Sequence, residues 1–250
     1  MLRLVTLDVT NTLLKFSRPP GEQYAAIGQL YGLNANPKKL SEAFRIIFKK
    51  HEKEVPFYGA SSIGWQNWWL NVVADTFRKA DCPADDDTLK KVGYHLNKHF
   101  SHGGAYELID GSIPLLTRLQ SKSLKIGAVS NFDERLDSIL IQLGIKHYFD
   151  FVLTSYSLNC AKPDPKIFNK ALELAGNKIK PSEALHIGDD IHCDYLGARE
   201  CGWQSILVSK NVRDLCQENG LKPDASSMFI SLREVLPILD DSTVPKDIRT

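Results

Sequence analysis

The stretch LVTLDVTNTLL, residues 4–14, places one carboxylate near the end of a short apolar run. Residues 4–9 are rich in apolar and β-branched side chains, which predicts a buried strand. Asp8 lies near the end of this strand, and Thr10 and Thr12 add hydroxyl groups just beyond it. A carboxylate in such a place can act as a nucleophile or bind a cation.

Polar side chains also follow three later apolar runs. Ser130 and Asn131 end LKIGAVSN, Lys162 lies in AKPDP, and Asp189 and Asp190 end ALHIGDD with Asp194 shortly after them. Together these residues supply a carboxylate nucleophile, a hydroxyl donor, an ammonium and a second group of carboxylates. Such a set suits a phosphoryl group and a hard divalent cation, because magnesium prefers oxygen ligands and lysine offsets phosphate charge. We therefore expect Mg²⁺ as the cofactor.

The elements that must bring these side chains together alternate along the chain. After residue 111, apolar β-rich runs alternate with helical patterns; the runs cover residues 124–131, 149–155, 184–190, 204–210 and 228–230. Alternation of this kind predicts an α/β fold with a doubly wound parallel sheet. Ligands bind such sheets beyond the carboxyl ends of the strands, which is where the polar residues lie.

A block of helical patterns separates the first strand from the rest. Residues 22–100 contain four amphipathic stretches, with stripes such as Leu40, Ile47 and Phe48 or Trp65, Trp69 and Val73, that predict a small bundle. We therefore expect an α/β core made of residues 1–16 and 111–250, and an inserted helical domain over residues 17–110.

The composition excludes several classes of protein. The 250 residues are 43% hydrophobic and 24% charged, with a formal net charge of +1, so no electrostatic bias toward nucleic acid or membranes is present. No apolar run approaches the roughly 20 residues that cross a bilayer. The five cysteines form no CxxC pair and indicate reduced thiols, and we interpret His95, His99 and His102 as solvated rather than metal-binding.

These features predict a cytoplasmic protein, with nuclear entry open, that has neither a nucleic-acid nor a membrane partner. Asp8 lies so near Met1 that a cleavable presequence of about 15 residues or more would remove it. We therefore expect no such presequence.

Four motifs in chain order resemble one family. LDVTNTL, VSN, AKPDPKIF and GDDIHCD look like the motifs of haloacid dehalogenase-like (HAD) hydrolases, whose fold is a Rossmann-like core with a mobile helical cap. The resemblance implies that Asp8 forms an aspartyl-phosphate and that Ser130 and Lys162 hold the phosphoryl group. It also implies that Asp189 binds magnesium with Asp8 and that Asp194 supports the metal site. We add Thr12 and Asn131 to the expected phosphate-binding residues.

Thr10 departs from this pattern. Phosphatases of the family usually have Asp here as general acid and base, and a threonine hydroxyl does not titrate near neutrality. Losing that group costs about 10²- to 10⁴-fold in rate. The family's metal ligand at this position is a backbone carbonyl, so Thr10 stays among the expected metal ligands. Asn11 stands where Gly is usual, and Asn tolerates the positive φ of such a turn.

Three functions remain open. The first is a magnesium-dependent phosphohydrolase of a small phosphorylated molecule, with weak or narrow activity, in which Asp190, Asp133 or a cap side chain replaces the missing acid. The second is a catalytically deficient protein that keeps the pocket to bind a phosphorylated ligand or to regulate a partner. The third is dehalogenation, which the pair Asp189 and Asp190 disfavours because a metal-free site does not need it. The cap sequence, including the loop 55–65, does not name the substrate.

Overall fold

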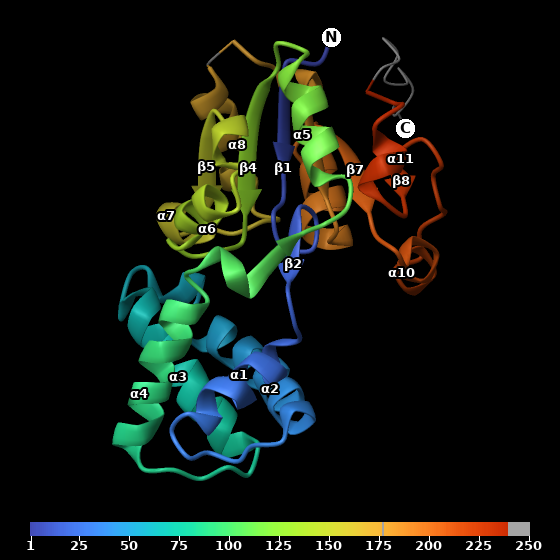
Figure 1. Ribbon diagram of the computed structural model, residues 1–250. Coiled ribbons are helices and arrows are strands. Elements are labelled where there is room, and N and C mark those ends of the chain that lie inside the picture. The colour runs from blue at the N-terminus through green and yellow to red at the C-terminus, as the bar shows by residue number, and fades with distance from the viewer. Residues whose placement is uncertain (177, 240–250) are drawn as a thin grey trace. The chain divides into compact units, whose positions relative to one another are not determined.

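The structure, a computed structural model, describes residues 1–176 and 178–239. Six strands form a parallel sheet in the order β5-β4-β1-β6-β7-β8 (Figure 1). In chain order they are β1 (Leu4–Leu7), β4 (Lys125–Ser130), β5 (Phe151–Thr154), β6 (Ala184–Gly188), β7 (Gln204–Val208) and β8 (Met228–Phe229). Each lies in a stretch that the sequence predicts as a strand, and the predicted α/β fold is confirmed.

Among the described residues, the unit that contains the sheet also has six α-helices, which lie before, between or after these strands in the chain. They are α5 (Ser112–Gln120), α7 (Ser155–Leu158), α8 (Pro165–Ala175), α9 (Gly197–Glu200), α10 (Val212–Glu218) and α11 (Leu232–Val235). Residues Ile191–Leu196, directly before α9, form a π-helical segment. A strand, a helix and the next parallel strand make the repeating unit of a doubly wound sheet.

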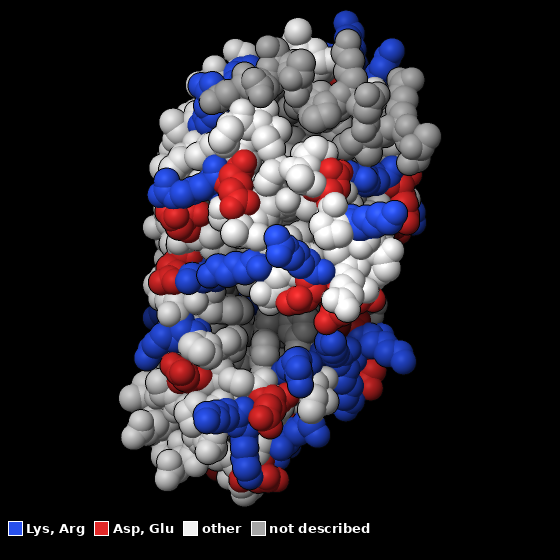
Figure 2. All heavy atoms as spheres, turned by 90° about the vertical axis from the view of Figure 1, so that its right-hand side faces the viewer, with Lys and Arg blue, Asp and Glu red and all other residues white. Residues whose placement is uncertain are grey.

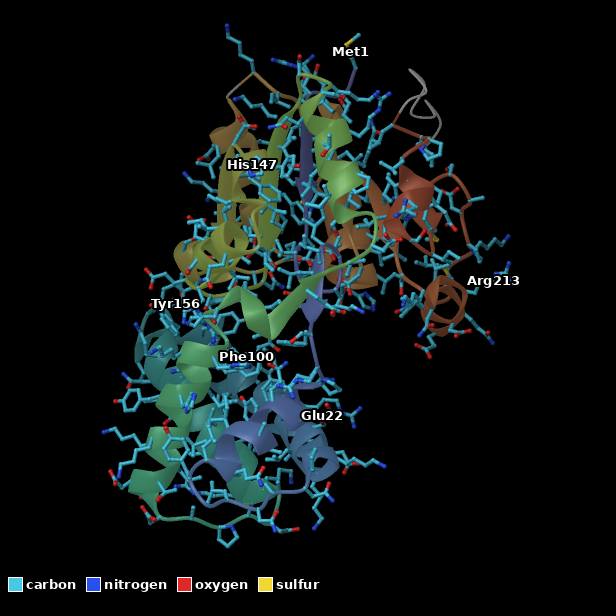
Figure 3. All side chains as sticks on the ribbon, viewed as in Figure 1. Met1, Glu22, Phe100, His147, Tyr156 and Arg213 are labelled. Atoms are coloured by element: carbon cyan, nitrogen blue, oxygen red, sulfur yellow. The ribbon has the colours of Figure 1, made fainter. Side chains whose placement is uncertain are left out.

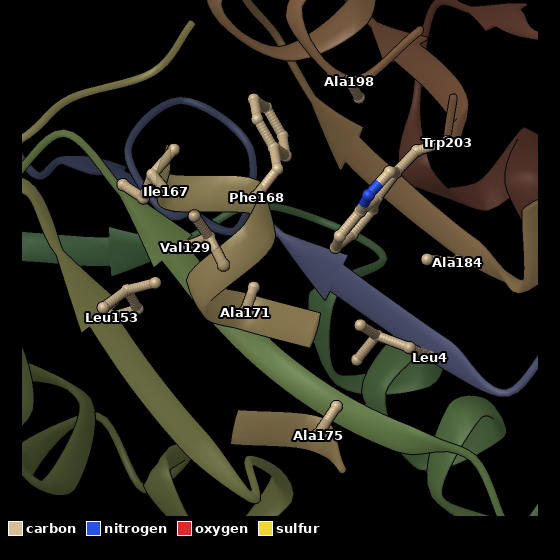
Figure 4. Close-up of a cluster of buried hydrophobic side chains, with 10 residues drawn as sticks. All are labelled: Leu4, Val129, Leu153, Ile167, Phe168, Ala171, Ala175, Ala184, Ala198 and Trp203. Atoms are coloured by element: carbon tan, nitrogen blue, oxygen red, sulfur yellow. The ribbon is translucent and has the colours of Figure 1, made fainter. Parts of the chain in front are cut away.

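An apolar cluster holds α8 against the central strands. Leu4 of β1 and Val129 of β4 pack with Ile167 and Phe168 of α8, and all four side chains are fully buried (Figure 4). The helix starts where Asp164 accepts a hydrogen bond from the Lys166 amide and Pro165 takes the first position, a favourable start for a helix. This packing holds α8 against β1 and β4, the two strands whose carboxyl ends are followed by candidate site residues.

The chain divides into two compact units. One comprises residues 1–15, 108–131 and those from Gly144 to the end of the described residues, and contains the parallel sheet. The other comprises Phe16–Glu107 together with Phe132–Leu143. Residues 240–250, the end of the expected core, lie outside the described residues. The role of residues 17–110 as a cap stays a prediction.

The second unit is helical. Its main helices are α1 (Pro20–Gln29), α2 (Pro37–Glu54), α3 (Gly64–Lys79), α4 (Asp86–His99) and the shorter α6 (Leu136–Gln142). Tyr24, Trp68 and Phe77 are among its fully buried side chains. The ring of Phe100, labelled in Figure 3, lies 6.0 Å from that of Tyr24. Apolar stripes at helical spacing therefore form a shared aromatic core.

Two short strands were not predicted from the sequence. β2 (Leu14–Phe16) pairs with β3 (Tyr106–Leu108) in a separate two-stranded sheet. Both boundaries between the main segments of the two units fall within or beside these strands. Strands of three residues carry too little periodicity to be recognised.

The surface carries charges of both signs. On the face drawn in Figure 2, Lys and Arg side chains alternate with Asp and Glu and with uncharged residues. None of the helices in the described part of the chain has the length and apolar character that crossing a membrane requires.

Candidate active site

Asp8 directly follows the central strand of the sheet. The Asp8 amide donates to the Ile187 carbonyl of β6 at 2.9 Å, so residue 8 continues the path of β1 beside that strand. β1 also pairs with β4, whose last residue is Ser130. The end of β1 therefore lies between the ends of β4 and β6, where the sequence places Ser130 and Asp189.

The Asp8 carboxylate accepts hydrogen bonds from three predicted site residues. Ser130 Oγ donates to Asp8 Oδ1 at 3.0 Å, and Lys162 Nζ lies 2.7 Å from the same oxygen. Thr12 Oγ1 lies 3.5 Å from Asp8 Oδ2 and 3.2 Å from Asp189 Oδ1. Asp8 itself is only 7% exposed. The structure thus brings a buried carboxylate together with a hydroxyl and an ammonium, which are groups that bind phosphate oxygens.

Asn131 acts on the backbone of Lys162. Its side-chain amide donates to the Lys162 carbonyl at 2.9 Å and accepts from the Lys162 amide at 2.8 Å. This pair of hydrogen bonds joins the end of β4 to the loop that carries Lys162. Asn131 therefore orients the lysine, a contact that the sequence does not reveal.

Both oxygens of the Asp194 carboxylate have partners. Oδ1 lies 2.6 Å from Lys162 Nζ and 3.0 Å from His186 Nε2, while the Asp190 amide donates to Oδ2 at 3.0 Å. Asp194 lies in the π-helical segment, a kind of turn that recurs at functional sites. Gly188 leaves room for it, because a Cβ atom at Gly188 would lie 2.2 Å from Asp194 Cγ.

His186 was not predicted as a site residue. It is fully buried in β6, with Nε2 near Asp194 and Nδ1 2.7 Å from Thr6 Oγ1. An ionised carboxylate only accepts hydrogen bonds, so Nε2 carries a proton. Burial lowers the pKa of His186 and so favours the neutral ring, in which Nδ1 accepts from the Thr6 hydroxyl. One sequence signal could have identified it: a histidine lies within an otherwise apolar strand, two residues before the glycine that ends the strand.

Charges and burial shift the pKa values of the four central ionisable groups. Burial, reinforced by the Asp194 charge and opposed by Lys162, raises the pKa of Asp8 to about 6. Burial and the charges of Asp8 and Asp194 raise the pKa of Asp189 to about 8. Burial disfavours the charged forms of Asp194 and Lys162, but their attraction and hydrogen bonds outweigh it, so the pKa of Asp194 is lowered and that of Lys162 is raised.

The three carboxylates form a candidate cation site. One oxygen each from Asp8, Asp189 and Asp194 lies within 4.8 Å of the others, the only such cluster among the described residues. Lys162 supplies a single positive charge to this group. Burial is the largest cause of the raised pKa values of Asp8 and Asp189, and the charges of the neighbouring carboxylates add to it. Hard oxygen donors of this kind fit magnesium. The residues present therefore fit the expected ion.

The hydroxyl of Thr10 is buried. Its Oγ1 atom makes no hydrogen bond to any described residue. Buried polar atoms usually have partners, so this hydroxyl can donate to or accept from a bound molecule. The next residue, Asn11, has a φ of 63°, as expected for the turn.

Two proposed substitutes for the missing acid already have other partners. Asp190 Oδ1 accepts from the His192 and Cys193 amides at 2.8 and 2.7 Å, so it caps the π-helical segment. Asp133 is buried in the helical unit and pairs with Arg135. Both carboxylates therefore already accept hydrogen bonds within the protein.

Known proteins resemble the chain over almost its whole length. Residues 2–202 match the sequence model of the family described as haloacid dehalogenase-like hydrolase. Rhythmically expressed gene 2 protein of Drosophila melanogaster is 36% identical, covering 97% of this chain and 96% of that protein. Human haloacid dehalogenase-like hydrolase domain-containing protein 3 is 37% identical, covering 96% and 94%.

Solved structures match the fold. A putative HAD hydrolase from Bacillus subtilis, bound to magnesium, has a TM-score of 0.67 at 17% identity and covers 96% of this chain and 99% of its own. A HAD phosphatase from Thermococcus onnurineus has a TM-score of 0.57 at 23% identity, covering 95% and 98%. An L-2-haloacid dehalogenase from Xanthobacter autotrophicus has a TM-score of 0.67 at 15% identity, covering 97% and 100%. The family match and the curated relatives together show that the chain belongs to the haloacid dehalogenase-like hydrolase family.

Proposed function

We propose that the protein is a magnesium-dependent phosphohydrolase that acts on a small phosphorylated molecule. The observation that carries this proposal is the Asp8 carboxylate, which takes hydrogen bonds from Ser130 Oγ and Lys162 Nζ at the end of the central strand. A carboxylate nucleophile and two donors for phosphate oxygens are the parts that phosphoryl transfer to a side chain requires.

The reaction would proceed in two steps. An Asp8 oxygen attacks phosphorus and the bond to the leaving group breaks, which gives an aspartyl-phosphate. Ser130 and Lys162, whose donors face Asp8, would bind the transferred phosphoryl oxygens. Water then attacks phosphorus, releases inorganic phosphate and restores the Asp8 carboxylate. Asn131 holds Lys162 in place through both steps.

Asp8, Asp189 and the Thr10 carbonyl would hold the magnesium ion, with Asp194 in support. When bound, the ion would offset the charge of the phosphoryl group and of the converging carboxylates. Asp194 already accepts hydrogen bonds on both oxygens. Its main part in this site is therefore to fix Lys162 and the π-helical segment.

Thr10 limits the activity. A leaving alkoxide must gain a proton and the attacking water must lose one, and a threonine hydroxyl does neither near neutral pH. Phosphate and metal binding do not need a carboxylate at this position. The expected enzyme therefore binds its substrate well and turns it over slowly, or accepts only substrates with a good leaving group.

The second candidate is a catalytically deficient protein that binds a phosphorylated ligand or regulates a partner. The buried Thr10 hydroxyl, which has no hydrogen-bond partner among the described residues, favours it, because binding needs a hydrogen-bonding group there and catalysis needs a titrating one.

The helical unit is proposed as the cap that selects the substrate. We also propose a cytoplasmic location, since the odd number of cysteines without a CxxC pair suits a reducing compartment. No nucleic-acid or membrane partner is proposed.

Trapping the phosphoenzyme tests the proposed function. The protein is mixed with an aryl phosphate, with magnesium or with chelator, and quenched in acid. Acid-stable phosphate on Asp8 that requires magnesium and is absent from Asp8→Asn supports the proposal. If ligand binding is measurable but neither phosphoenzyme nor free phosphate forms from any of a panel of phosphate esters, the second candidate is correct.

A further inference from the structure

A tryptophan of α3 binds the turn that follows Ser130. Trp69 Nε1 donates to Asp133 Oδ2 at 2.7 Å. Asp133 also pairs with Arg135 through two side-chain hydrogen bonds, 2.8 Å from Nε to Oδ1 and 2.6 Å from Nη2 to Oδ2. Asp133 and Arg135 are 1% and 6% exposed. The Trp69 indole therefore completes a buried ion pair.

Aromatic rings surround the guanidinium of this pair. The Arg135 Cζ atom lies 4.8 Å from the ring centroid of Trp69, 5.3 Å from that of Trp65 and 5.9 Å from that of Phe132. A buried ion pair tolerates little movement, because its desolvation is offset only when geometry and hydrogen bonds are maintained. The position of Asp133 is therefore tightly determined by α3.

The same turn leads directly to the phosphate-binding residues. Ser130 and Asn131 belong to the unit that contains the parallel sheet, called the sheet unit below. Phe132 is the first residue of the segment 132–143, which belongs to the helical unit. Only Asn131 and Phe132 separate Ser130 from Asp133 in the sequence. A shift of Asp133 must therefore be absorbed within two residues or reach Ser130, whose hydroxyl donates to Asp8.

The far end of this segment is also bound to the helical unit. Gln142 Oε1 accepts from the Gly103 amide at 3.0 Å, and Gln142 Nε2 donates to the Ser101 carbonyl at 3.1 Å. The chain returns to the sheet unit at Gly144, whose φ of 72° suits glycine. Residues 132–143 are thus held at both ends by contacts within the helical unit.

We infer that Trp69 is a positioning residue for Ser130 and Asn131, acting through Asp133. This inference rests on the proposed function, because it assigns Trp69 a part in the same phosphoryl-transfer site. The helical unit then influences the chemistry at Asp8 through the covalent chain after β4, in addition to any part it has in choosing the substrate.

The test compares Trp69→Phe with a matched control, Trp65→Phe. Both residues lie in α3 and face Arg135, and each donates an indole hydrogen bond to an acidic residue of the same turn. Trp65 Nε1 donates to the exposed Glu134 at 2.9 Å, whereas Trp69 donates to the buried Asp133. Both substitutions keep an aromatic ring, so they differ mainly in which carboxylate loses its donor.

Two measurements are made on the full-length protein. The first is the single-turnover rate constant for Asp8 phosphorylation by an aryl phosphate with magnesium. The second is hydrogen–deuterium exchange, without substrate, in peptides that cover residues 131–135. We expect Trp69→Phe to lower the rate constant between about 2- and 30-fold and to speed exchange in those peptides. Trp65→Phe should leave both close to the unmodified protein.

Equal effects of the two substitutions, or no effect of Trp69→Phe on either measurement, would overturn the inference. A change in exchange without a change in rate overturns the link to Ser130, and a change in rate without one in exchange overturns the route through Asp133. If the unmodified protein forms no phosphoenzyme, the proposed function fails instead. The exchange measurement then decides the inference alone: faster exchange only in Trp69→Phe supports it, and unchanged exchange rejects it.

Discussion

Lys162 Nζ lies 2.6 Å from Asp194 Oδ1, and both side chains are buried. The same ammonium lies 2.7 Å from Asp8 Oδ1, so one positive charge serves two carboxylates. His186 and the Asp190 amide complete the hydrogen bonds of Asp194. Lys162 therefore has a structural role in addition to its proposed role toward phosphate.

Lys162→Met should strongly destabilise the protein. It leaves two buried carboxylates without their cation, and breaking a buried pair in this way costs about 3–5 kcal/mol of unfolding free energy. Urea unfolding measures the loss. The control is Lys170→Met, because Lys170 pairs with Glu173 at the surface, where side chains are 43% and 60% exposed and such pairs contribute under about 1 kcal/mol. Equal losses in both variants would contradict the role given to Lys162.

The effect of magnesium on stability should depend on pH. The folded-state pKa of Asp189, about 8, is above its ordinary value of 3.8. In the metal-free protein this group contributes stability that is present below the ordinary pKa and is lost as pH rises through about 8. Magnesium binds the deprotonated carboxylates, so the increase in melting temperature that it causes should grow as pH rises through the pKa values of Asp8, about 6, and of Asp189, about 8.

Asp189→Asn is the control for this dependence. The variant removes one carboxylate and its repulsion, so the metal-free protein should melt at a higher temperature near pH 8 than the unmodified one. Its response to magnesium should be small at every pH. A magnesium shift of equal size in both proteins would exclude Asp189 as a ligand.

Gly188→Ala should disrupt the site by displacing Asp194. The added Cβ would lie 2.2 Å from Asp194 Cγ, so Asp194 cannot keep the position in which it contacts Lys162 and the Asp190 amide. We expect loss of the magnesium-induced thermal shift and of Asp8 phosphorylation. At Gly104, by contrast, a Cβ would meet no atom within 4 Å, which makes Gly104→Ala the matched control. Unchanged magnesium binding in Gly188→Ala would show that Asp194 does not need this space.

Much of the fold could be predicted from local patterns in the sequence. The apolar runs that end in Asp8, Ser130 and Asp189 predicted three strands of one parallel sheet, because β-rich runs between helical patterns have few other arrangements. The parallel sheet then brought their ends together, as the rule for ligand sites in such sheets requires. The left-handed turn at Asn11 was expected from the family resemblance, and asparagine is one of the residues that tolerate it.

Contacts made by side chains across the sheet could not be predicted in the same way. The sequence places His186 in a buried strand, but only the fold shows that its side chain contacts Asp194. From the sequence we expected Asn131 to bind phosphate, and only the structure shows that it binds the Lys162 backbone. Nor did any pattern show that residues 132–143 group with the helical unit, since that grouping depends on tertiary contacts such as the one between Trp69 and Asp133.

Thr10→Asp tests the consequence of the missing acid. Thr10 Oγ1 is buried without a hydrogen-bond partner among the described residues, so the position has a hydroxyl where a carboxylate would serve as acid and base. In the unmodified protein, aryl phosphates should phosphorylate Asp8 far more readily than alkyl phosphates, because a phenolate leaves without a proton. The aspartyl-phosphate should persist, because position 10 cannot activate water. Thr10→Asp should raise turnover by about 10-fold or more, below the full effect because the pocket did not form around that group.

The measurement is the steady-state rate on one aryl and one alkyl phosphate, with acid quench of the phosphoenzyme. Thr10→Asn is the matched control, because it has the shape of Asp but does not titrate, and its turnover should stay low. Asp8→Asn should abolish the phosphoenzyme with either residue at position 10. If the unmodified protein hydrolyses alkyl phosphates as fast as aryl ones, another residue is the acid and Thr10 is no defect. If Thr10→Asp stays inactive with every ester while still binding phosphate, the site is one for binding, and the lost carboxylate at position 10 is only part of what separates it from an enzyme.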